Sequence, residues 1–481
     1  MAFNSVQFLY FFPSVVLVYF LVPRPFRWIV LLLASYGFYM AWKPEYVLML
    51  AIPTVADWFI GKRIASHSDE TIRKRWLLAS LALNIGILFT LKYYNLIAIT
   101  MQNIADRYSL PVLFYGVDAA LPAGISFYTF QTLGYVIDVY RQNQEPETKL
   151  SRYALFLAFF PALMAGPISR ARQLLPQHAA THSFDYNNLT AGLQLMLWGF
   201  FKKLVIADRL AIYVSQVYDH PKDHFGWDII IATYFFAYQI YCDFSGYTDI
   251  ARGCAQVLGY TLPENFRRPY AATSIRDFWQ RWHITLTSWF REYLFFALGV
   301  SRKSKLKGYR NVVIVFLVCG LWHGASWTFV VWGGIHGLLS VASLATAGFR
   351  ERVANITGIS KLPRLRHALQ MLVTFHAVLL AWVFFRANSF ADIGVLAENV
   401  RRLDLSKVIF NGGLDKSQMI LALVCIALLE VVQYFQSHVS LREWIGQRPV
   451  LVRWSLSYAA LFVTLLFAAD SATVQFLYFQ F

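Results

Sequence analysis

The chain has 481 residues, of which 57% are hydrophobic and only 15% are charged. A soluble domain of this length carries more charge, so the composition excludes an ordinary soluble protein. The formal net charge of +16 does not indicate a nucleic-acid partner, because the basic residues stand in short segments between apolar blocks, where they set membrane topology. The cysteines lie in or beside apolar stretches without metal-ligand spacing, so we expect no metal site and no disulfide framework.

About ten to twelve apolar blocks approach the length that crosses the hydrocarbon core of a membrane. Because a backbone in lipid must satisfy its own hydrogen bonds, these blocks predict helices and an all-α integral membrane protein. The sequence has no internal repeat and no soluble segment, so we expect residues 1–481 to form a single membrane-embedded domain. In chain order, the expected helices cover residues 5–22, 26–42, 45–60, 77–91, 121–139, 153–167, 189–207, 228–241, 367–385, 419–435 and 454–469, with two further passes within 311–349.

The basic residues between these helices predict the orientation of the chain. Arg24 and Arg27 follow the first helix, and further clusters surround Arg73 and Lys305. Loops rich in Lys and Arg stay in the cytoplasm, so we expect these loops to be cytoplasmic and both termini to be extracytoplasmic.

The segment 238–260 interrupts an apolar run with Asp243, Ser245 and Asp249. A broken, polar stretch survives at membrane depth only where it lines a cavity or is buried in protein, which favours the wall of a substrate tunnel. The other interpretation is a helix end at the membrane interface, capped by Asp243 and Ser245. A catalytic pair between Asp243 and a histidine further along the chain, His323, stays open.

The segment 274–299 separates into two faces on a helical wheel, which predicts an amphipathic helix lying in the membrane interface. His283 falls on the border between the faces, so the segment is either functional or a lipid-surface anchor with an incidental histidine. The apolar face includes Trp279 and Trp282, and the polar face includes Arg276, Arg281 and Arg291.

The segment 319–337 places His323 and His336 inside an apolar stretch. Ionisable residues within a membrane are rare, costly and usually functional, although a backbone carbonyl can also satisfy a histidine. On one continuous helix the two histidines would lie about 140° apart, so we expect only one at a reacting centre. The surrounding tryptophans include Trp322 and Trp327, and several glycines indicate close helix packing or a cavity.

A histidine in this setting suits acyl transfer. A hydroxyl acceptor must lose its proton as it attacks a thioester or ester carbonyl, and a neutral imidazole accepts that proton at physiological pH. The sequence contains no G-x-S-x-G motif, P-loop or dinucleotide fingerprint, so these mechanisms have no support.

Two of these segments resemble the characteristic regions of the membrane-bound O-acyltransferase (MBOAT) family. They read RDFWQRWHITLTSWFREYLFFALG at 276–299 and GLWHGASWTFVVWGGIHG at 320–337. Other stretches match the bacterial, AlgI-like branch of alginate O-acetyltransferases, so the resemblance extends along the chain. These stretches are LPAGISFYTFQTLGYVIDVYR, FPALMAGPISR, CDFSGYTDIA, ENFRRPY, FFRANSF and FLYFQF.

The resemblance implies a bundle of about 11 transmembrane helices, with re-entrant or interfacial segments around a central tunnel. The essential histidine of the family maps onto His323, and its second characteristic histidine maps onto His283. Cationic side chains would attract the phosphates of a donor coenzyme. The expected tunnel residues are Trp279, Trp282, Asp243, Ser245, Trp322, Trp327 and His336, and the expected donor-binding residues are Arg276, Arg281 and Arg291.

The resemblance also implies a function in the bacterial inner membrane. The enzyme would take an acetyl group from a cytoplasmic donor, with acetyl-CoA as the expected donor substrate and no bound cofactor. The acetyl group would pass to an extracytoplasmic acetyltransferase partner and to polysaccharide export machinery, for O-acetylation of an alginate-like exopolysaccharide. Membrane lipids are the other expected partners. One stretch departs from the branch, which usually has Leu-Gly-Gly-Asn-Arg where this chain has residues 298–302, so donor binding stays open.

Other functions are compatible with the residues. O-acetylation of peptidoglycan or cellulose would use the same chemistry, and D-alanyl transfer to teichoic acid is more remote. A transporter without acyl-transfer chemistry usually shows paired half-repeats, and none is found in this sequence.

The aromatic-rich segment 475–481 suggests a further step. Such a segment would fold back into an apolar groove rather than stay in water. Tyr478 would then face His323, lose its phenolic proton and accept the acyl group as a phenyl ester, which stays reactive because the phenol pKa is near 10. The alternative is that the segment belongs to the last helix and its interfacial aromatic belt.

Overall fold

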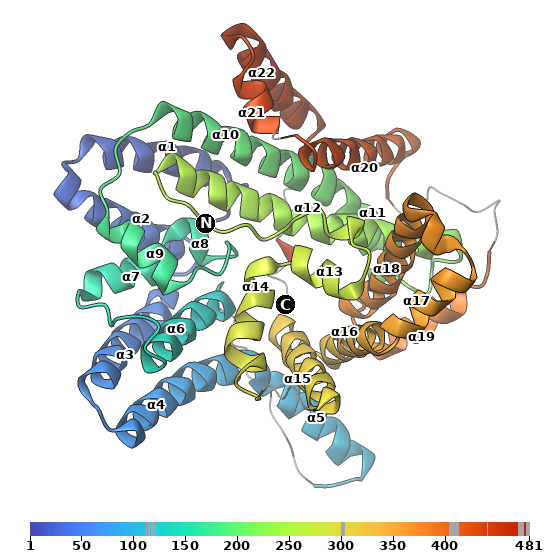
Figure 1. Ribbon diagram of the computed structural model, residues 1–481, viewed down its shortest axis with the longest axis horizontal. Coiled ribbons are helices and arrows are strands. Elements are labelled where there is room, and N and C mark those ends of the chain that lie inside the picture. The colour runs from blue at the N-terminus through green and yellow to red at the C-terminus, as the bar shows by residue number, and fades with distance from the viewer. Residues whose placement is uncertain are drawn as a thin grey trace. The chain divides into compact units, whose positions relative to one another are not determined.

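The computed structural model describes residues 1–111, 113, 116, 122, 124–299, 304–403, 413–439, 441–469 and 476–477. Within these ranges every regular element is a helix (Figure 1). The all-α fold predicted from the apolar blocks is therefore confirmed.

Six helical segments in the described ranges are long and apolar enough to cross a membrane, so the protein is a multi-pass membrane protein. The predicted total of about 11 transmembrane helices is not established by these segments. They are Glu70–Arg107, Tyr186–Asp219, Trp327–Ala345, Pro363–Arg386, Lys416–Gln436 and Val450–Phe467, and Val6–Leu21 is a shorter apolar helix.

The chain forms two compact units, each assembled from separate stretches of sequence. One comprises Met1–Met196 with Ile250–Pro263, and the other comprises Leu197–Asp249 with Glu264–Phe481. The single domain expected over residues 1–481 stays a prediction.

The first unit consists of helices of different lengths, from the 21 residues of Tyr46–Ser66 to the four residues of Phe160–Leu163. The helix expected at 77–91 continues through a π-helical turn, Phe89–Tyr93, as far as Arg107. The helix expected at 153–167 is instead two short helices, because the backbone leaves the helical region at Phe159, two residues before Pro161. The helices are α1 Val6–Leu21, α2 Arg27–Met40, α3 Tyr46–Ser66, α4 Glu70–Leu88, α5 Tyr94–Arg107, α6 Ile125–Tyr140, α7 Leu150–Ala158, α8 Phe160–Leu163 and α9 Ala171–Ala179.

A buried carboxylate joins three helices of this unit. Asp57 on α3 accepts hydrogen bonds from Ser80 Oγ at 2.6 Å and Asn84 Nδ2 at 2.7 Å on α4, and from Thr132 Oγ1 at 2.7 Å on α6. A buried polar group is costly unless it is hydrogen-bonded, so these bonds hold the three helices in one arrangement.

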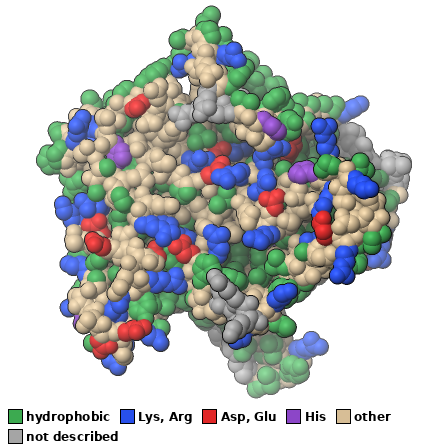
Figure 2. Space-filling model, viewed as in Figure 1, with side chains coloured by type: hydrophobic (Ala, Val, Ile, Leu, Met, Phe, Trp, Pro, Cys, Tyr) green, Lys and Arg blue, Asp and Glu red, His purple; other side chains and the backbone are tan. Residues whose placement is uncertain are grey.

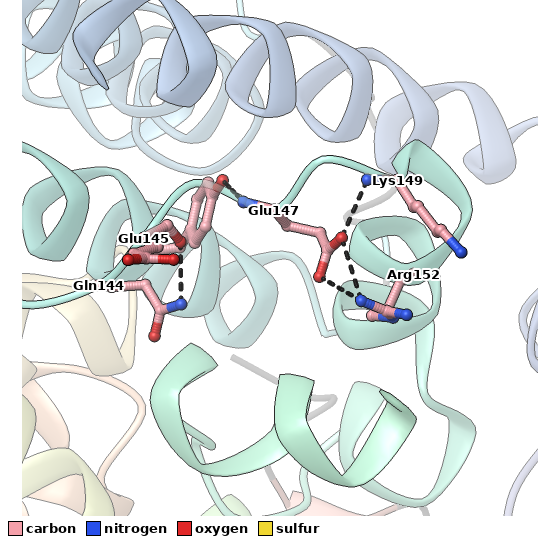
Figure 3. A network of polar contacts seen from close by, with 6 residues as sticks. Gln144, Glu145, Glu147, Lys149 and Arg152 are labelled. Atoms are coloured by element: carbon pink, nitrogen blue, oxygen red, sulfur yellow. Dashed lines mark hydrogen bonds and ion pairs between the residues drawn. The ribbon is translucent and has the colours of Figure 1, made fainter. Parts of the chain in front are cut away.

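The connection between α6 and α7 is fixed by polar contacts around Glu147 (Figure 3). The backbone N–H of Glu147 donates to Tyr135 Oη at 2.9 Å, and its carboxylate accepts from Lys149 N at 2.9 Å and from Arg152 Nη1. The turn therefore satisfies its own backbone groups where the chain reverses.

The helices α10 Tyr186–Phe200 and α12 Trp227–Val257 each contribute to both units. The remaining helices belong to the second unit, and α15 and α16 form an antiparallel hairpin within it. They are α11 Asp208–Asp219, α13 Ile275–Arg281, α14 Ile284–Trp289, α15 Lys305–His323, α16 Trp327–Ala345, α17 Ala347–Ile356, α18 Pro363–Arg386, α19 Phe390–Asn399, α20 Lys416–Gln436, α21 Leu441–Gly446 and α22 Val450–Phe467, with π-helical turns at Phe201–Ala207 and Phe290–Phe295.

Glycines allow the α15–α16 hairpin to pack closely. A Cβ atom on Gly320 would run into the backbone oxygen of Phe329, and one on Gly333 would run into that of Phe316. Small residues at a crossing let two helical backbones approach, as expected from the glycine pattern.

The surface drawn in Figure 2 carries basic side chains spread across the face, with acidic side chains among them. The apolar side chains exposed on several long helices, such as Leu372, Val373 and Leu380 on α18, are the kind that lipid covers in a membrane protein.

Candidate active site

His323 is the last residue of α15 and only 3% of its surface is exposed. The helix ends there because Gly324 is extended, with φ −159° and ψ 154°. The next helix, α16, begins after Ser326, whose side chain accepts a hydrogen bond from Thr328 N. The three-residue connection therefore buries His323 at the closed end of the helical hairpin.

Aromatic rings surround the His323 imidazole. Ring centroids lie 4.8 Å away for Trp322, 5.0 Å for Trp332 and 5.4 Å for Phe385, and all three meet the imidazole at steep angles. Such an apolar lining keeps water away from an imidazole that could accept a proton from a hydroxyl.

His336 belongs to the same aromatic cluster, so the expectation that only one histidine lies at the centre is wrong. The two histidines do not share one continuous helix, because the chain reverses between His323 and His336. Both imidazoles contact Trp332, at 5.0 Å for His323 and 4.9 Å for His336. His336 is fully buried and also contacts Trp279 at 5.0 Å, so the two histidines lie near one another despite their spacing.

His283 is fully buried at a break in the predicted interfacial helix. The expected single helix over 274–299 is wrong, because α13 ends at Arg281 and His283 takes the left-handed conformation with φ 42°. The expected lipid-facing surface is wrong for the same region, since Trp279 and Trp282 are buried.

Asn265 determines which nitrogen of His283 carries the proton. Asn265 Oδ1 accepts from Thr285 N at 3.2 Å, and a backbone N–H can only donate, so this atom is the carbonyl oxygen. His283 Nδ1 lies 3.3 Å from the same oxygen and therefore donates, which makes Nε2 the basic nitrogen. Burial lowers the pKa of His283 to about 3, so the ring stays neutral at physiological pH.

Trp322 connects the two histidines that the sequence resemblance singles out. Its ring lies 6.1 Å from His283 and 4.8 Å from His323, so one indole separates the two imidazoles. Trp282 packs against Trp382 of α18 at 5.0 Å, whereas Trp327 is half-exposed in the first turn of α16.

The polar residues of α12 do not interrupt it. The helix continues from Trp227 to Val257, so both a broken tunnel wall and a capped helix end are wrong as local structures. Asp243 pairs with Lys203, and Ser245 Oγ accepts from Lys202 Nζ at 3.0 Å. Because both Asp243 oxygens are bonded elsewhere, to Lys203 Nζ and Leu477 N, a catalytic pair of Asp243 with His323 has no support.

The arginines predicted to bind a donor differ in their surroundings. Arg276 and Arg291 are exposed, whereas Arg281 is bonded to Asp277 through Nε at 2.7 Å. Their role in donor binding stays a prediction. Residues 300–302 of the divergent turn and Tyr478 lie outside the described residues.

Two groups of residues in the site were missed. Asn265, inside the ENFRRPY stretch, is not distinguished by any feature of its own. Lys202 and Lys203 stand in the apolar block expected at 189–207, and charged residues inside such a block were a usable signal. In the described part of the chain, no three His, Cys, Asp or Glu side chains are grouped to hold a metal ion.

The fold and the site define a multi-pass helical membrane protein with histidines buried among aromatic rings. Residues 147–385 match the MBOAT, membrane-bound O-acyltransferase family. The chain is 36% identical over 394 residues to the probable alginate O-acetylase AlgI of Pseudomonas aeruginosa, a match that covers 81% of this chain and 72% of the relative.

Two other relatives show the range of the family. The peptidoglycan O-acetyltransferase of Helicobacter pylori is 34% identical over 425 residues, covering 80% of this chain and 77% of the relative. The teichoic acid D-alanyltransferase of Bacillus subtilis is 28% identical over 276 residues, covering 56% and 69% respectively. The chain therefore belongs to the membrane-bound O-acyltransferase family, and it is an acyltransferase.

Proposed function

We propose that this enzyme takes an acetyl group from cytoplasmic acetyl-CoA and passes it across the inner membrane for O-acetylation of an extracytoplasmic, alginate-like polysaccharide. The observation that carries the proposal is the burial of His323 among Trp322, Trp332 and Phe385, in a chain 36% identical to a probable alginate O-acetylase. Such a pocket suits a reaction that must exclude water, because water would hydrolyse the acyl donor.

His323 acts as the general base in the proposed reaction. It takes the proton of the acceptor hydroxyl as the oxygen attacks the carbonyl carbon of the thioester. The new C–O bond forms, the C–S bond breaks, and the proton moves to the leaving thiolate, so that free coenzyme A is released. His283, with Nδ1 directed to Asn265, contributes the basic Nε2 on the donor side. The exposed Arg276 and Arg291 attract the phosphates of the coenzyme.

Tyr478 serves in this proposal as the first acceptor. Its phenolic oxygen receives the acetyl group from the thioester, and the phenyl ester then passes it to an extracytoplasmic acetyltransferase partner working with the polysaccharide export machinery. Dividing a transfer across a membrane into two steps makes each step easier. The burial of the neighbouring Phe476 and Leu477 supports this assignment.

The direction of transfer follows from the proposed topology. Both termini lie outside the cytoplasm, and the loops around Arg73 and Lys305 lie inside it. Single cysteines placed in these loops should resist an impermeant maleimide added to intact cells and react after the cells are opened. Labelling of either loop in intact cells would contradict the orientation.

A direct test uses the purified protein in liposomes with radiolabelled acetyl-CoA outside. The proposal predicts release of coenzyme A and acetyl label on the protein or on an added acceptor. A transporter would release no coenzyme A, and that result would overturn the proposal.

Peptidoglycan is the second candidate acceptor, because the Helicobacter pylori relative is 34% identical over 80% of this chain. Parallel assays with alginate fragments and with peptidoglycan fragments distinguish the two acceptors.

A further inference from the structure

A fully buried ion network surrounds Lys203 in the π-helical turn Phe201–Ala207. Lys203 Nζ lies 2.6 Å from Asp208 Oδ1 and 2.7 Å from Asp243 Oδ1, and each of these side chains is at most 3% exposed. Burying three charges is costly, and only good mutual geometry offsets the loss of hydration. π-Helical turns are rare and frequently occur at functional sites, which indicates that this network has a function beyond stabilising the fold.

Asp243 has a second contact, with a segment more than two hundred residues away. Its Oδ2 accepts a hydrogen bond from the backbone N–H of Leu477 at 2.8 Å. Leu477 is 4% exposed and Phe476 is 5% exposed, although neither belongs to α22, which ends at Phe467. A carboxylate bonded to a backbone N–H fixes the position of the main chain whatever the side chain is.

Two further bonds hold the same stretch where α22 ends. Arg209 Nη2 donates to Phe467 O at 2.8 Å, and Ala469 N donates to Leu204 O at 2.9 Å. Leu204 lies in the π-helical turn beside Lys203, and Arg209 lies in α11, which follows that turn. The end of α22 and the pair Phe476–Leu477 therefore both contact elements that adjoin Lys203.

The docked segment reaches the neighbourhood of His283 through aromatic contacts. The Phe476 ring stacks on Tyr247 with centroids 4.4 Å apart and also contacts Phe244 at 5.9 Å. Phe244 in turn meets the His283 imidazole at 4.7 Å. A single phenyl ring thus separates the docked segment from a histidine of the candidate active site.

We propose that Asp243, held by Lys203, is a positioning residue that docks Phe476–Leu477 on α12 beside His283. The Lys203 ammonium contacts Oδ1 and orients the carboxylate, so that Oδ2 faces the Leu477 N–H. This contact fixes the main chain at Leu477. What the docking is for rests on the proposed function, in which Tyr478 receives the acetyl group.

Docking is tested without any assay of activity. Leu477→Cys keeps the backbone N–H and places a thiol at the buried position, so a membrane-permeant maleimide should react with it slowly. In Asp243→Ala the same thiol should react about tenfold faster or more, because the segment loses its anchor. The same protein without Leu477→Cys gives the background of the four buried native cysteines.

Asp208→Asn is the matched control for the ion network. It removes the other carboxylate beside Lys203 and leaves the Asp243–Leu477 bond in place. The proposal predicts a much smaller rise in thiol labelling than in Asp243→Ala. Equal labelling in the two variants would mean that the network is only structural, and unchanged labelling in Asp243→Ala would mean that Asp243 does not dock the segment. Either result overturns the proposal.

The positioning role is tested with Leu477→Pro, which removes the N–H donor, against Leu477→Ala, which truncates the side chain and keeps the donor. The rate of acetyl transfer should be about 10- to 100-fold lower in the proline variant than in the alanine variant, with the KM for acetyl-CoA unchanged. Equal rates would overturn the positioning role even if the thiol test shows docking. Failure of the relay is seen separately, as full transfer in Tyr478→Phe, and leaves the thiol test unaffected.

Discussion

The imidazole of His323 meets the indole of Trp332 edge to face, with centroids 5.0 Å apart and ring planes at 86°. Trp332 is fully buried, and its ring also contacts His336 at 4.9 Å and stacks on Trp382 at 5.8 Å. One side chain therefore forms a common wall for two histidines that lie on consecutive helices of the hairpin.

Trp332→Ala should destabilise the protein by about 3–5 kcal/mol, because it leaves a large cavity in a packed core. Acyl transfer should fall with it, since His323 loses one side of its pocket. Trp454→Ala, at an exposed tryptophan of α22, is the control. Thermal unfolding of the detergent-solubilised variants measures the effect, and an equal midpoint for both would contradict the packing of Trp332 in the core.

Gly320→Ala should destabilise the α15–α16 hairpin by about 1–3 kcal/mol, because the added methyl group meets the backbone oxygen of Phe329. Gly334→Ala on the same hairpin places its methyl group 3.5 Å from Leu317 Cδ2, an ordinary contact. The thermal unfolding midpoint should therefore fall in the first variant and stay close to that of the wild type in the second. The reverse order would show that the hairpin does not pack in this way.

Asn265→Ala should lower the rate of acyl transfer by about 100-fold, because His283 loses the hydrogen-bond partner of Nδ1. This figure is the lower end of the range of rate enhancements that general acid–base catalysis contributes. Thr285→Val removes a different bond to Asn265, at 2.7 Å, and leaves the His283 contact in place. Steady-state kinetics on both variants should show the larger fall in kcat for Asn265→Ala. A larger effect from Thr285→Val would assign Asn265 to local structure alone.

The pKa of His283 predicts how stability changes with pH. Burial lowers this pKa from 6.5 to about 3, so the unfolded chain binds a proton as the pH falls below 6.5 while the folded protein does not. Stability is therefore lost on acidification, by about 2 kcal/mol between pH 7.5 and pH 5 from this group. His283→Gln should lose less stability over that range than His438→Gln, a control at an exposed histidine, when unfolding is followed at both pH values. An identical loss in the two variants would contradict a buried, neutral His283.

Helices that are apolar throughout were predictable from sequence to within a few residues. The expected ranges 5–22, 367–385 and 419–435 correspond to α1 Val6–Leu21, α18 Pro363–Arg386 and α20 Lys416–Gln436. Hydropathy suffices there, because the hydrocarbon core fixes both the length and the composition of such a segment.

The break at His283 was not predictable, because it depends on contacts between distant parts of the chain. Ile284 N donates to Asn265 O at 2.9 Å, and Arg267 N donates to Arg281 O at 2.9 Å. These bonds hold the chain in a left-handed turn, whereas a helical wheel assumes a continuous helix. The helical wheel therefore predicted an interfacial helix for the segment 274–299, which is broken at His283 and buried around it.

The polar residues of α12 illustrate a related limit. Asp243 and Asp249 suggested an interruption because a single sequence does not show their partners. Lys203 and Lys202 satisfy them from another helix, so the helix continues without a break. The available signal was the presence of charged residues in two otherwise apolar segments, 189–207 and 238–260. Pairing the lysines of the first segment with the aspartates of the second would have predicted these ion pairs.

The central claim is that His323 is the general base for acyl transfer, and His323→Ala tests it most directly. Coenzyme A release from acetyl-CoA should be measured in liposomes with the variant, the wild type and His438→Ala, a control at an exposed histidine. The His323 variant should insert and fold but lose at least about 100-fold in rate, while the His438 variant keeps the wild-type rate. Wild-type release of coenzyme A by His323→Ala would contradict it.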